Sequence, residues 1–406
     1  MAFFEASVVP DRRHHPSLIP RCGACGLHKT CISPKMPVTG EGKLGILVIA
    51  EAPGEEEDEK NEQFIGPAGQ VLRQSLQKFG FDLDRDCWKT NALICRPENN
   101  KTPTPDQIDY CRPNLTNTIN KLKPRVIVPM GGAAVRSLLG PYWRDDPGKI
   151  SQWVGWQIPL QKLNAWVTPT YHPSYVLRSE KEREGAVIKL WFERHLRAAF
   201  ELEGYPWDVV PDYRRQIKIV MDPDEAAEWI RDRLGRGGLF SFDYETNRLK
   251  PDAENAEIIC CSICWAGAET IAYPWVGEAI QATREFVQSD VKKIGANNKF
   301  ESRWSRRILE VGVKNWVWDT MQCAHVLDCR PGITSVKFQG FVRLGVEDWS
   351  ANMKAYLHDT REDGTNRIRE ADLRSLLLYC GLDSLIEFHI AVIQKREMEK
   401  GFPWHD

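Results

Sequence analysis

Several features that would assign this sequence to a special class are missing from it. No apolar run approaches the roughly 20 residues that a membrane-spanning helix requires, so we expect no membrane partner. The first residues, MAFFEASVVPDRRHH, contain no charged stretch followed by a long apolar one, so we expect no secretory signal and a cytoplasmic location. Neither sign of charge dominates, because 54 Lys and Arg stand against 56 Asp and Glu. The net charge of −2 therefore does not by itself indicate a nucleic-acid partner.

The length of the chain predicts more than one domain. Its 406 residues exceed the roughly 250–300 residues at which a single hydrophobic core stops growing. Fifteen Trp and fifteen Phe supply ample core and exclude a disordered chain. The clearest boundary is EGYPWDVVPDYRR at residues 203–215, where two prolines and a glycine separate strongly patterned segments. We expect a first domain at residues 1–205, a linker at 206–214 and a second domain at 215–406.

The first domain alternates between strand and helix patterns. Buried-strand runs at 44–50, 88–94, 125–128 and 165–168 are separated or followed by amphipathic helices that start near 67, 132 and 188. This alternation predicts a parallel sheet with helices on both faces, a three-layer α/β/α fold, with ligand loops at the carboxyl ends of the strands.

The second domain has a different order of elements. Strand patterns at 217–221, 239–243, 258–265 and 270–273 come first, and the rest of the chain is mainly helical, which predicts a mixed sheet. The residues at the start of the first helix of this domain match known helix-capping preferences. Asp222 suits the N-cap, Pro223 the first helical position and Glu225 the closing position of a capping box.

Twelve cysteines in a reducing compartment are not expected to form six disulfides. Cys22 and Cys25 form a close pair, and Cys95 and Cys111 stand apart from it and from each other. Thiolates suit either zinc or an iron–sulfur cluster, and a zinc site usually uses two close pairs. Both interpretations stay open on spacing alone. The remaining cysteines of this domain, Cys31 and Cys87, are expected to be ordinary core thiols.

Four loops follow strands of the first domain: AEAPGEEED (50–58), FIGPAG (64–69), TNALICRPENNKTPTP (90–105) and TYHPSYVLR (170–178). Together with the cysteines, these motifs resemble the iron–sulfur uracil-DNA glycosylases over about residues 18–200. Ala50 departs from the family, which usually has Gly there. Another branch of the superfamily couples covalently to uracil DNA through a basic, His-containing insert. This chain has PENNKTPTP at that place, so we do not expect covalent coupling.

The resemblance implies a site for extruded uracil, because a glycosylase must take its base out of the stack. It implies that Phe64 stacks on the base, Asn91 pairs with N3–H and O4, and His172 donates to O2 as negative charge develops. Glu51 would orient a water near C1′. It further implies uracil contacts from Ala52 and Glu57, DNA-backbone contacts from Pro173, Ser174 and Arg178, and a [4Fe–4S] cluster on Cys22, Cys25, Cys95 and Cys111.

The second domain contains three motifs: LFSFDYET (239–246), GANNKFES (295–302) and YCGLDS (379–384). Asp243 and Glu245 are two residues apart on a strand, so their carboxylates point to the same face. Tyr379 and Asp383 are four apart on a predicted helix and share a face as well. These motifs resemble the 3′–5′ proofreading exonuclease domain of bacterial and phage family A DNA polymerases, in the subgroup with Tyr in the last motif, over about residues 215–406.

This second resemblance implies an RNase H-like fold and hydrolysis of DNA by two divalent ions, Mg or Mn. It assigns the metal ligands to Asp243, Glu245, Glu301 and Asp383, water orientation to Tyr379, and substrate positioning to Asn298 and Lys299. Glu301 departs from the Asp of relatives by one methylene. Asp319 is expected to begin a structural helix. The nearby thiols Cys260, Cys261 and Cys264 are expected to be core residues, since neighbours on a strand point to opposite faces.

We therefore interpret the chain as a bifunctional enzyme that excises uracil from DNA and degrades DNA from its 3′ end. Its expected partners are uracil-containing DNA, 3′ ends and a separately encoded DNA polymerase, in a host cytoplasm if a virus encodes the chain. Two alternatives remain. The first part could sense uracil without excising it, and both sites could have decayed in an accessory protein, an alternative that Glu301 keeps open.

Overall fold

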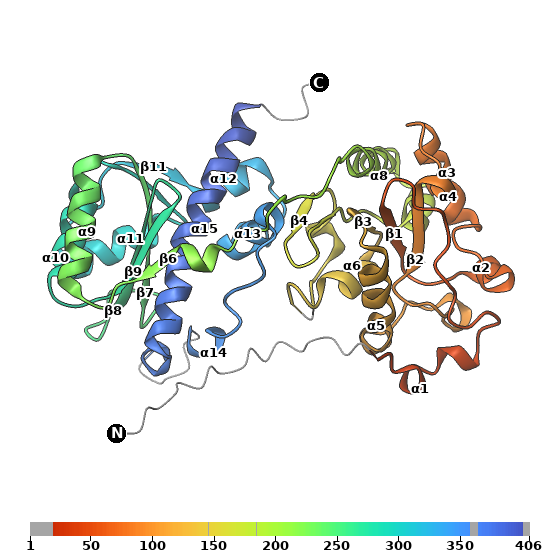
Figure 1. Cartoon of the computed structure of the whole chain (residues 1–406), viewed down its shortest axis with the longest axis horizontal. Helices are drawn as coiled ribbons and strands as arrows, with labels where there is room; N and C mark the ends of the chain where they lie inside the picture. Colours follow the sequence, from red (N-terminus) through yellow and green to blue (C-terminus); the bar gives the residue numbers. More distant parts are fainter. Residues whose placement is uncertain (1–18, 145, 184, 358–363, 401–406) are drawn as a thin grey trace. The chain divides into compact units, whose positions relative to one another are not determined.

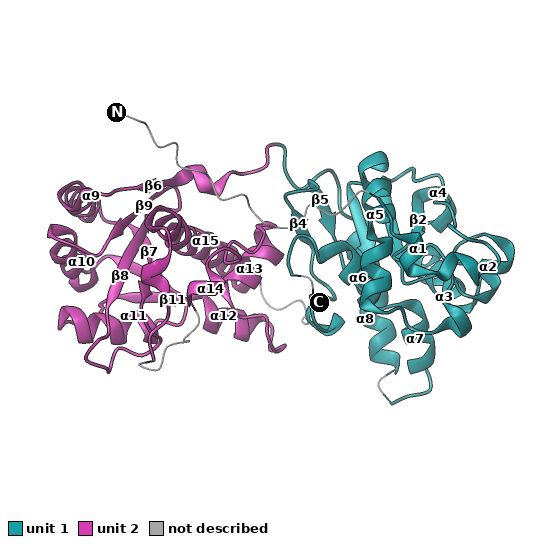
Figure 2. Cartoon of the chain, turned by 90° about the horizontal axis from the view of Figure 1, so that it is seen from below, with its two compact units in different colours: residues 1–208 teal, residues 209–406 magenta. Residues whose placement is uncertain are grey.

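The structure, a computed structural model, describes residues 19–144, 146–183, 185–357 and 364–400. It divides into two compact units, Met1–Asp208 (unit 1) and Val209–Asp406 (unit 2), which Figure 2 colours separately. The N-terminal stretch on which we based the expectation of no secretory signal lies outside the described residues.

Unit 1 is built on a five-stranded sheet with the order β2-β1-β3-β5-β4. Its strands are β1 (Ile46–Ala50), β2 (Cys87–Asn91), β3 (Val126–Pro129), β4 (Ile158–Leu160) and β5 (Ala165–Val167). Four of them are parallel, but β4 runs antiparallel to β5. The prediction of a wholly parallel sheet is therefore wrong at this edge. The three-residue strand β4 is followed by a tight turn with Asn164 at φ 43°, and so short a hairpin leaves no readable periodicity.

Helices cover both faces of this sheet, as the sequence predicts (Figure 1). One face carries α3 (Pro67–Gln77), α7 (Pro173–Ser179) and α8 (Gly185–Phe200), and the other carries α5 (Pro105–Leu122) and α6 (Gly132–Leu139). Shorter helices are α1 (Cys22–Cys25), α2 (Glu55–Lys60) and α4 (Leu83–Asp86). The β1 residues Ile46, Val48 and Ala50 pack with α3 and α8, because alternate residues of a strand face one side of the sheet.

Unit 2 has a six-stranded mixed sheet with the order β11-β10-β7-β8-β9-β6. Its strands are β6 (Ile217–Ile219), β7 (Leu239–Thr246), β8 (Ile258–Trp265), β9 (Glu269–Pro274), β10 (Lys292–Gly295) and β11 (Trp316–Asp319). The prediction that the chain is mainly helical after residue 273 misses β10 and β11. Both strands are only four residues long, and the buried β10 residue Lys293 hides the apolar pattern that marks a strand.

Helices α9 (Pro223–Arg236) and α10 (Glu278–Gln288) pack on one face of this sheet. The opposite face carries α15 (Leu373–Glu399), with α12 (Thr320–Leu327) and α13 (Val336–Leu344) beside it; α11 (Lys299–Trp304) and α14 (Lys354–Leu357) are shorter. Asp222 caps α9 as predicted, accepting from Asp224 N–H at 2.9 Å. Glu225, expected to close a capping box, instead pairs with Lys218 at 2.6 Å.

Helix α15 corrects one expectation. Among the described helices it alone is long and apolar enough to cross a membrane by length and composition, although no apolar run of that kind was expected. Most of its apolar window is buried, and the helix packs along β7, β8 and β9. A helix buried in the core of its own unit can be as long and as apolar as a membrane-spanning helix. Helix α15 is such a core helix in unit 2.

Candidate active sites

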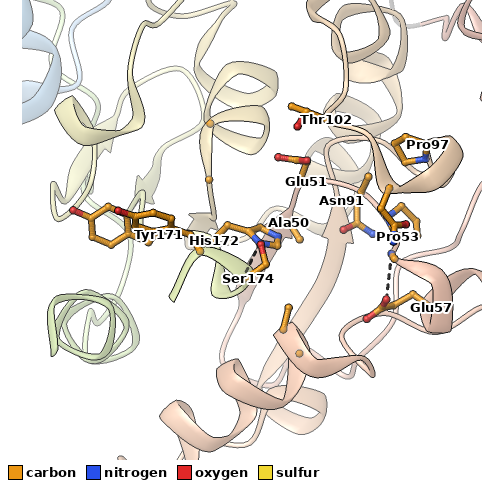
Figure 3. A pocket seen from close by; sticks show the side chains of 18 of the residues that line it. Ala50, Glu51, Pro53, Glu57, Asn91, Pro97, Thr102, Tyr171, His172 and Ser174 are labelled. Carbon is orange, nitrogen blue, oxygen red and sulfur yellow. Dashed lines mark hydrogen bonds between the residues drawn. The ribbon is translucent and has the colours of Figure 1, made fainter. Parts of the chain in front are cut away.

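Three strand ends of unit 1 surround one cavity of about 780 Å³ (Figure 3). Glu51 directly follows β1, and Asn91 is the last residue of β2. The two strands are parallel and pair Ala50 with Asn91, so both side chains lie at the same edge of the sheet. His172 follows β5 and comes to this edge through the parallel bridge between Met130 and Thr170.

The His172 imidazole is positioned by the start of α7. His172 is the N-cap of this helix, and its Nδ1 accepts from Ser174 N–H at 3.2 Å, with Ser174 Oγ at 2.8 Å. Burial, and then the charge of Arg178, lower the pKa of His172 to about 4. The ring is therefore neutral near pH 7, and a neutral ring whose Nδ1 accepts carries its proton on Nε2. His172 can thus donate a hydrogen bond without carrying a charge.

Phe64 is held in a left-handed backbone conformation, with φ 58°, and its side chain is buried in the cavity wall. A bulky residue adopts this conformation only when its surroundings impose it. A Cβ at Gly69 would lie 2.0 Å from Phe64 O, so only glycine allows α3 to pass so close. The guanidinium of Arg73 donates to the same carbonyl at 3.3 Å.

Two carboxylates stand among the described residues that line the cavity, and they differ in what they contact. Glu57 accepts from Gly54 N–H at 3.1 Å and from Gly66 N–H at 2.9 Å, so it joins two loops of the wall. Glu51 is half-buried; burial raises its pKa, and the charge of Arg178 opposes that rise. Glu51 is thus the carboxylate available to a water or a substrate.

The four cysteines singled out by spacing line a second, smaller cavity in unit 1, together with apolar residues such as Leu93. Cys22 and Cys25 come from α1, Cys111 from α5, and Cys95 from the loop after β2. Two N–H groups point at their sulfurs: Lys35 N donates to Cys95 Sγ at 3.3 Å, and Asn114 Nδ2 to Cys111 Sγ at 3.5 Å. Burial raises the pKa of the Cys95 thiol to about 12 and also raises that of Cys111.

The spacing of these sulfurs can be compared with what zinc and an iron–sulfur cluster require. Four thiolates at about 2.3 Å from a tetrahedral zinc lie about 3.8 Å from one another. Within the described part of the chain, the group of three or more ligand atoms lying within 4.8 Å of one another is Asp243, Glu245 and Cys380 in unit 2, and the cysteines of unit 1 do not form such a group. Their wider arrangement, with N–H donors to sulfur, fits an iron–sulfur cluster.

One carboxylate connects the segment before β1 to helix α2, which borders the cavity. Asp58 of α2 is 1% exposed and accepts from Ile32 N–H at 3.0 Å and Ser33 N–H at 2.8 Å. Cys31, directly before Ile32, is partly buried and packs against an apolar cluster that includes Leu27, Leu93 and Cys95. Cys87 is fully buried among core residues, as expected.

In unit 2, Asp243 and Glu245 of β7 point to the same side, and ligand atoms of both lie within 4.8 Å of each other and of Cys380. Burial, followed by the charge of Asp383, raises the pKa of Asp243 to about 8. Burial and the charge of Asp243 raise the pKa of Glu245 well above its usual value. Carboxylates crowded in this way favour protons or cations, which is the environment that hard divalent metals require.

Asp383 of α15 is engaged by three side chains. Lys337 Nζ lies 2.5 and 2.6 Å from its two oxygens, Trp349 Nε1 donates to Oδ1 at 2.9 Å, and Tyr379 also bonds to it. The Lys337 ammonium lies over the Tyr379 ring, 4.6 Å from its centroid. Burial lowers the pKa of Lys337, but the charge and hydrogen bond of Asp383, together with the charges of Glu245 and Asp243, outweigh burial and raise this pKa.

Three buried oxygens near these carboxylates have no hydrogen-bond partner within the described residues: Glu301 Oε2, Glu387 Oε1 and Asn298 Oδ1. Burial raises the pKa of Glu301 and of Glu387 well above the usual value, and each is raised further by neighbouring carboxylates. A buried acceptor without a partner costs free energy, so these oxygens favour a proton, a water or a cation.

Residues 37–195 match the uracil DNA glycosylase superfamily, and residues 217–399 match a 3′-5′ exonuclease family. The type-4 uracil-DNA glycosylase of Pyrobaculum aerophilum is 38% identical over 167 residues, which cover 40% of this chain and 82% of that protein. The chain belongs to the type-4 uracil-DNA glycosylase family. Its glycosylase unit is fused to an exonuclease unit of the 3′-5′ exonuclease family.

Two further similarities concern this fusion. The DNA polymerase of Bacillus phage SP01 is 24% identical over 327 residues, covering 72% of this chain and 34% of that protein. Escherichia coli RNase D aligns with a TM-score of 0.35 and 11% identity over 45% of this chain and 45% of its own. The two family matches confirm the resemblance to both families, and the two sheets with their covering helices confirm the two α/β folds.

In the glycosylase unit, the structure brings together nearly all residues that were assigned to uracil or DNA. Those lining the cavity are Glu51, Ala52, Glu57, Phe64, Asn91, His172, Ser174 and Arg178. Pro173 is not among them, because it is buried at the first position of α7. The sequence did not single out Tyr171, Tyr175 or Lys101, which also line the cavity, and only their position in the same loops could have pointed to them.

In the exonuclease unit, the agreement is less complete. Asp319 caps α12 as expected, and it also holds the backbone amides of Asn297 and Asn298 at 3.1 and 2.9 Å. The Asn298 side chain donates to Trp318 O at 3.2 Å, and Lys299 is exposed. Cys260 and Cys261 lie in cores on opposite faces of the sheet, as expected.

Four residues of the exonuclease site were not foreseen: Lys337, Trp349, Cys380 and Glu387. Glu387 could have been found, because it is four residues after Asp383 on one helix face. Lys337 and Trp349 come from segments without a recognisable motif, and only the tertiary fold places them.

Proposed function

We propose that the chain is a bifunctional DNA hydrolase, which cleaves the N-glycosidic bond of deoxyuridine in its glycosylase unit and removes nucleotides from 3′ ends in its exonuclease unit. The observation that carries the first activity is the neutral His172, whose free N–H and the Asn91 amide face one cavity. The family membership of both units supports the pair of activities.

In the proposed glycosylase reaction, extruded uracil stacks on Phe64 and presents its edge to Asn91. The Asn91 side chain offers a donor for O4 and an acceptor for N3–H, a pattern that cytosine does not match. As the bond to C1′ breaks, negative charge develops on the base, and His172 Nε2–H donates to O2. A neutral donor that is fixed in place before the reaction stabilises this charge without reorganisation.

Glu51 would orient the attacking water toward C1′, because it is the lining carboxylate that is not bound to backbone amides. Ser174 lies in the first turn of α7 and Arg178 in its last turn, where Arg178 Nη1 donates to Ser174 Oγ at 3.1 Å, and both can contact the DNA backbone. A [4Fe–4S] cluster on Cys22, Cys25, Cys95 and Cys111 would hold α1, α5 and the loop after β2 together.

In the proposed exonuclease reaction, Asp243 and Glu245, with Glu301 and Asp383, would hold two divalent ions, Mg or Mn. Bound ions supply the positive charge that activates water and stabilises the departing 3′ oxygen. Tyr379 bonds to Asp383 and is 8% exposed, so its position is fixed beside the carboxylates. It would orient the attacking water.

The test is incubation of the protein with a 5′-labelled single-stranded DNA that contains one uracil. We expect alkali-labile cleavage at the uracil without added metal, and a ladder shortening from the 3′ end with Mg²⁺ or Mn²⁺. Absence of an abasic product would refute the glycosylase activity, and binding without base release would instead indicate a uracil sensor. Absence of a ladder would refute the exonuclease activity.

We also propose a role in replication or repair beside a DNA polymerase. The similarity of 72% of the chain to part of a phage DNA polymerase supports this placement. Primer extension on a uracil-containing template, with and without the protein, tests it; the expected result is product that stops at excised sites and 3′ mismatches that are removed before extension. Unchanged extension would argue against it.

A further inference from the structure

The acidic site of the exonuclease unit already contains one positive charge, and that charge belongs to the chain. Lys337 Nζ contacts both oxygens of Asp383, at 2.5 and 2.6 Å. The ammonium also lies over the rings of Tyr379 and Trp349, 4.6 and 5.4 Å from their centroids. A carboxylate and two aromatic faces therefore surround the same cation, and each of them attracts it.

These contacts occupy the hydrogen-bond acceptor positions of the Asp383 carboxylate. An ionised carboxylate has about four lone-pair positions; Lys337 contacts both oxygens, and Trp349 and Tyr379 each take one further position. Among the described residues, Asp243, Glu245 and Cys380 have ligand atoms that all lie within 4.8 Å of one another, and Asp383 is not in that group. Asp383 is thus paired with a lysine while its neighbours across the site are open to a metal.

We propose that Lys337 is a built-in cation of the exonuclease site, which withholds Asp383 from divalent ions until a DNA phosphate arrives. The proposal rests on the exonuclease activity proposed above and names a positioning residue for it. A phosphate oxygen beside the site is a second anionic partner for the ammonium, and 20% of the Lys337 side chain is exposed and able to meet it. Movement of the ammonium toward phosphate would free Asp383 for a second divalent ion.

Binding of Mn²⁺ to the full-length protein without DNA tests this proposal, followed by the paramagnetic resonance signal of free Mn²⁺. We expect one site in the wild type, lost in Asp243→Asn. Lys337→Met keeps the length of the side chain but removes its charge, so it should bind Mn²⁺ about 10- to 100-fold more tightly or at one extra site. Lys337→Arg, the matched control, should behave as the wild type does. Unchanged or weaker binding by Lys337→Met would overturn the proposal.

A second variant keeps the proposal testable if Lys337→Met does not fold. Asp383→Asn should leave DNA-free Mn²⁺ binding unchanged, since Asp383 is not a ligand in that state, and a loss of binding would also overturn the proposal. Neither titration uses activity. Expected titrations without a 3′ ladder would refute the exonuclease function alone, and a ladder with weakened binding in Asp383→Asn would refute the role of Lys337 alone.

Discussion

The sites of the two units differ in how much charge they bury. The glycosylase cavity contains a neutral imidazole, an amide and one available carboxylate, and the donors are already in place. The exonuclease site gathers carboxylates whose pKa values burial and mutual repulsion raise, with Lys337 as their cation. The first site is complete as a set of protein groups, whereas the second requires cations to offset its charge. This difference predicts which changes each activity tolerates.

The largest effect is expected in the glycosylase unit. His172→Ala removes the donor to the uracil oxygen and should slow uracil release by about 1000-fold, the upper range for loss of one preorganised donor. Single-turnover release of uracil from a labelled oligonucleotide measures it. His172→Gln, which retains an N–H donor, should recover part of the rate. Equal loss in both variants would show that hydrogen-bond donation is not what His172 contributes.

Asp243→Asn should impair the exonuclease unit and not the glycosylase unit. It removes a carboxylate shared by the metal-binding group, and should slow 3′ degradation by more than about 100-fold, since even outer partners of metal ligands cost 10- to 100-fold. Removal of divalent ions by a chelator should have the same effect. Uracil release should be unchanged in both cases. A parallel loss of uracil release would break the contrast between the two units.

A substitution at Gly69 tests how strictly the glycosylase cavity is preorganised. Gly69→Ala places a Cβ 2.0 Å from Phe64 O and should displace the stacking residue, slowing uracil release by up to about 100-fold. Gly132→Ala is the matched control, because it lines the same cavity and its Cβ would meet no atom within 4 Å. Similar rates for the two variants would mean that the position of Phe64 is not critical.

Loss of the proposed cluster should lower the stability of the glycosylase unit more than it changes the rate of uracil release. Cys111→Ser is expected to bleach absorbance near 400 nm and lower the melting temperature of the glycosylase unit by about 5–10 °C, equivalent to a few kcal/mol. Calorimetry with an absorbance spectrum measures both. Cys31→Ser is the control and should retain the colour, because Cys31 does not line the cysteine cavity. Exonuclease activity should persist in both variants.

The smallest effect concerns pH. The pKa of His172 is about 4, so this residue stays neutral where an ordinary histidine, with a pKa of 6.5, becomes charged. Uracil release should therefore show no His172-dependent change between pH 7 and 5. Arg178→Ala removes a charge that lowers this pKa, which should rise by less than about one unit because burial is the larger cause. Titration of the ring by NMR measures it, and Arg178→Lys should show no rise.

Sequence reasoning succeeded where a residue's place follows from its own element. Asp243 and Glu245 are two apart on one strand, and Tyr379 and Asp383 four apart on one helix, so their shared faces follow from the backbone period. Asn91 and Glu51 meet because parallel strands end at one edge of the sheet. The same rule predicted the loops around the cavity.

Sequence reasoning failed where tertiary packing determines the position of a residue. Lys337 reaches Asp383 from another helix, across 46 positions of the sequence, and no local pattern marks it. The short strands β4, β10 and β11 gain their pairing from neighbours, and their residues show little period of their own. Glu57 lines the cavity, but its hydrogen bonds to Gly54 and Gly66 could not be predicted from the sequence, because they join loops whose positions depend on the fold.

Helix α2 connects the segment near the proposed cluster with the loops of the glycosylase cavity. Asp58 holds the segment that follows Cys31, and its neighbour Glu57 holds the loops that frame the base. Loss of the proposed cluster would remove an anchor on one side of this helix, and the loops of the cavity wall on the other side would be held less firmly. Oxidation of the cluster would thus loosen the frame around the base and lower the stability of the unit, while the side chains proposed to act on the base stay in the chain unaltered.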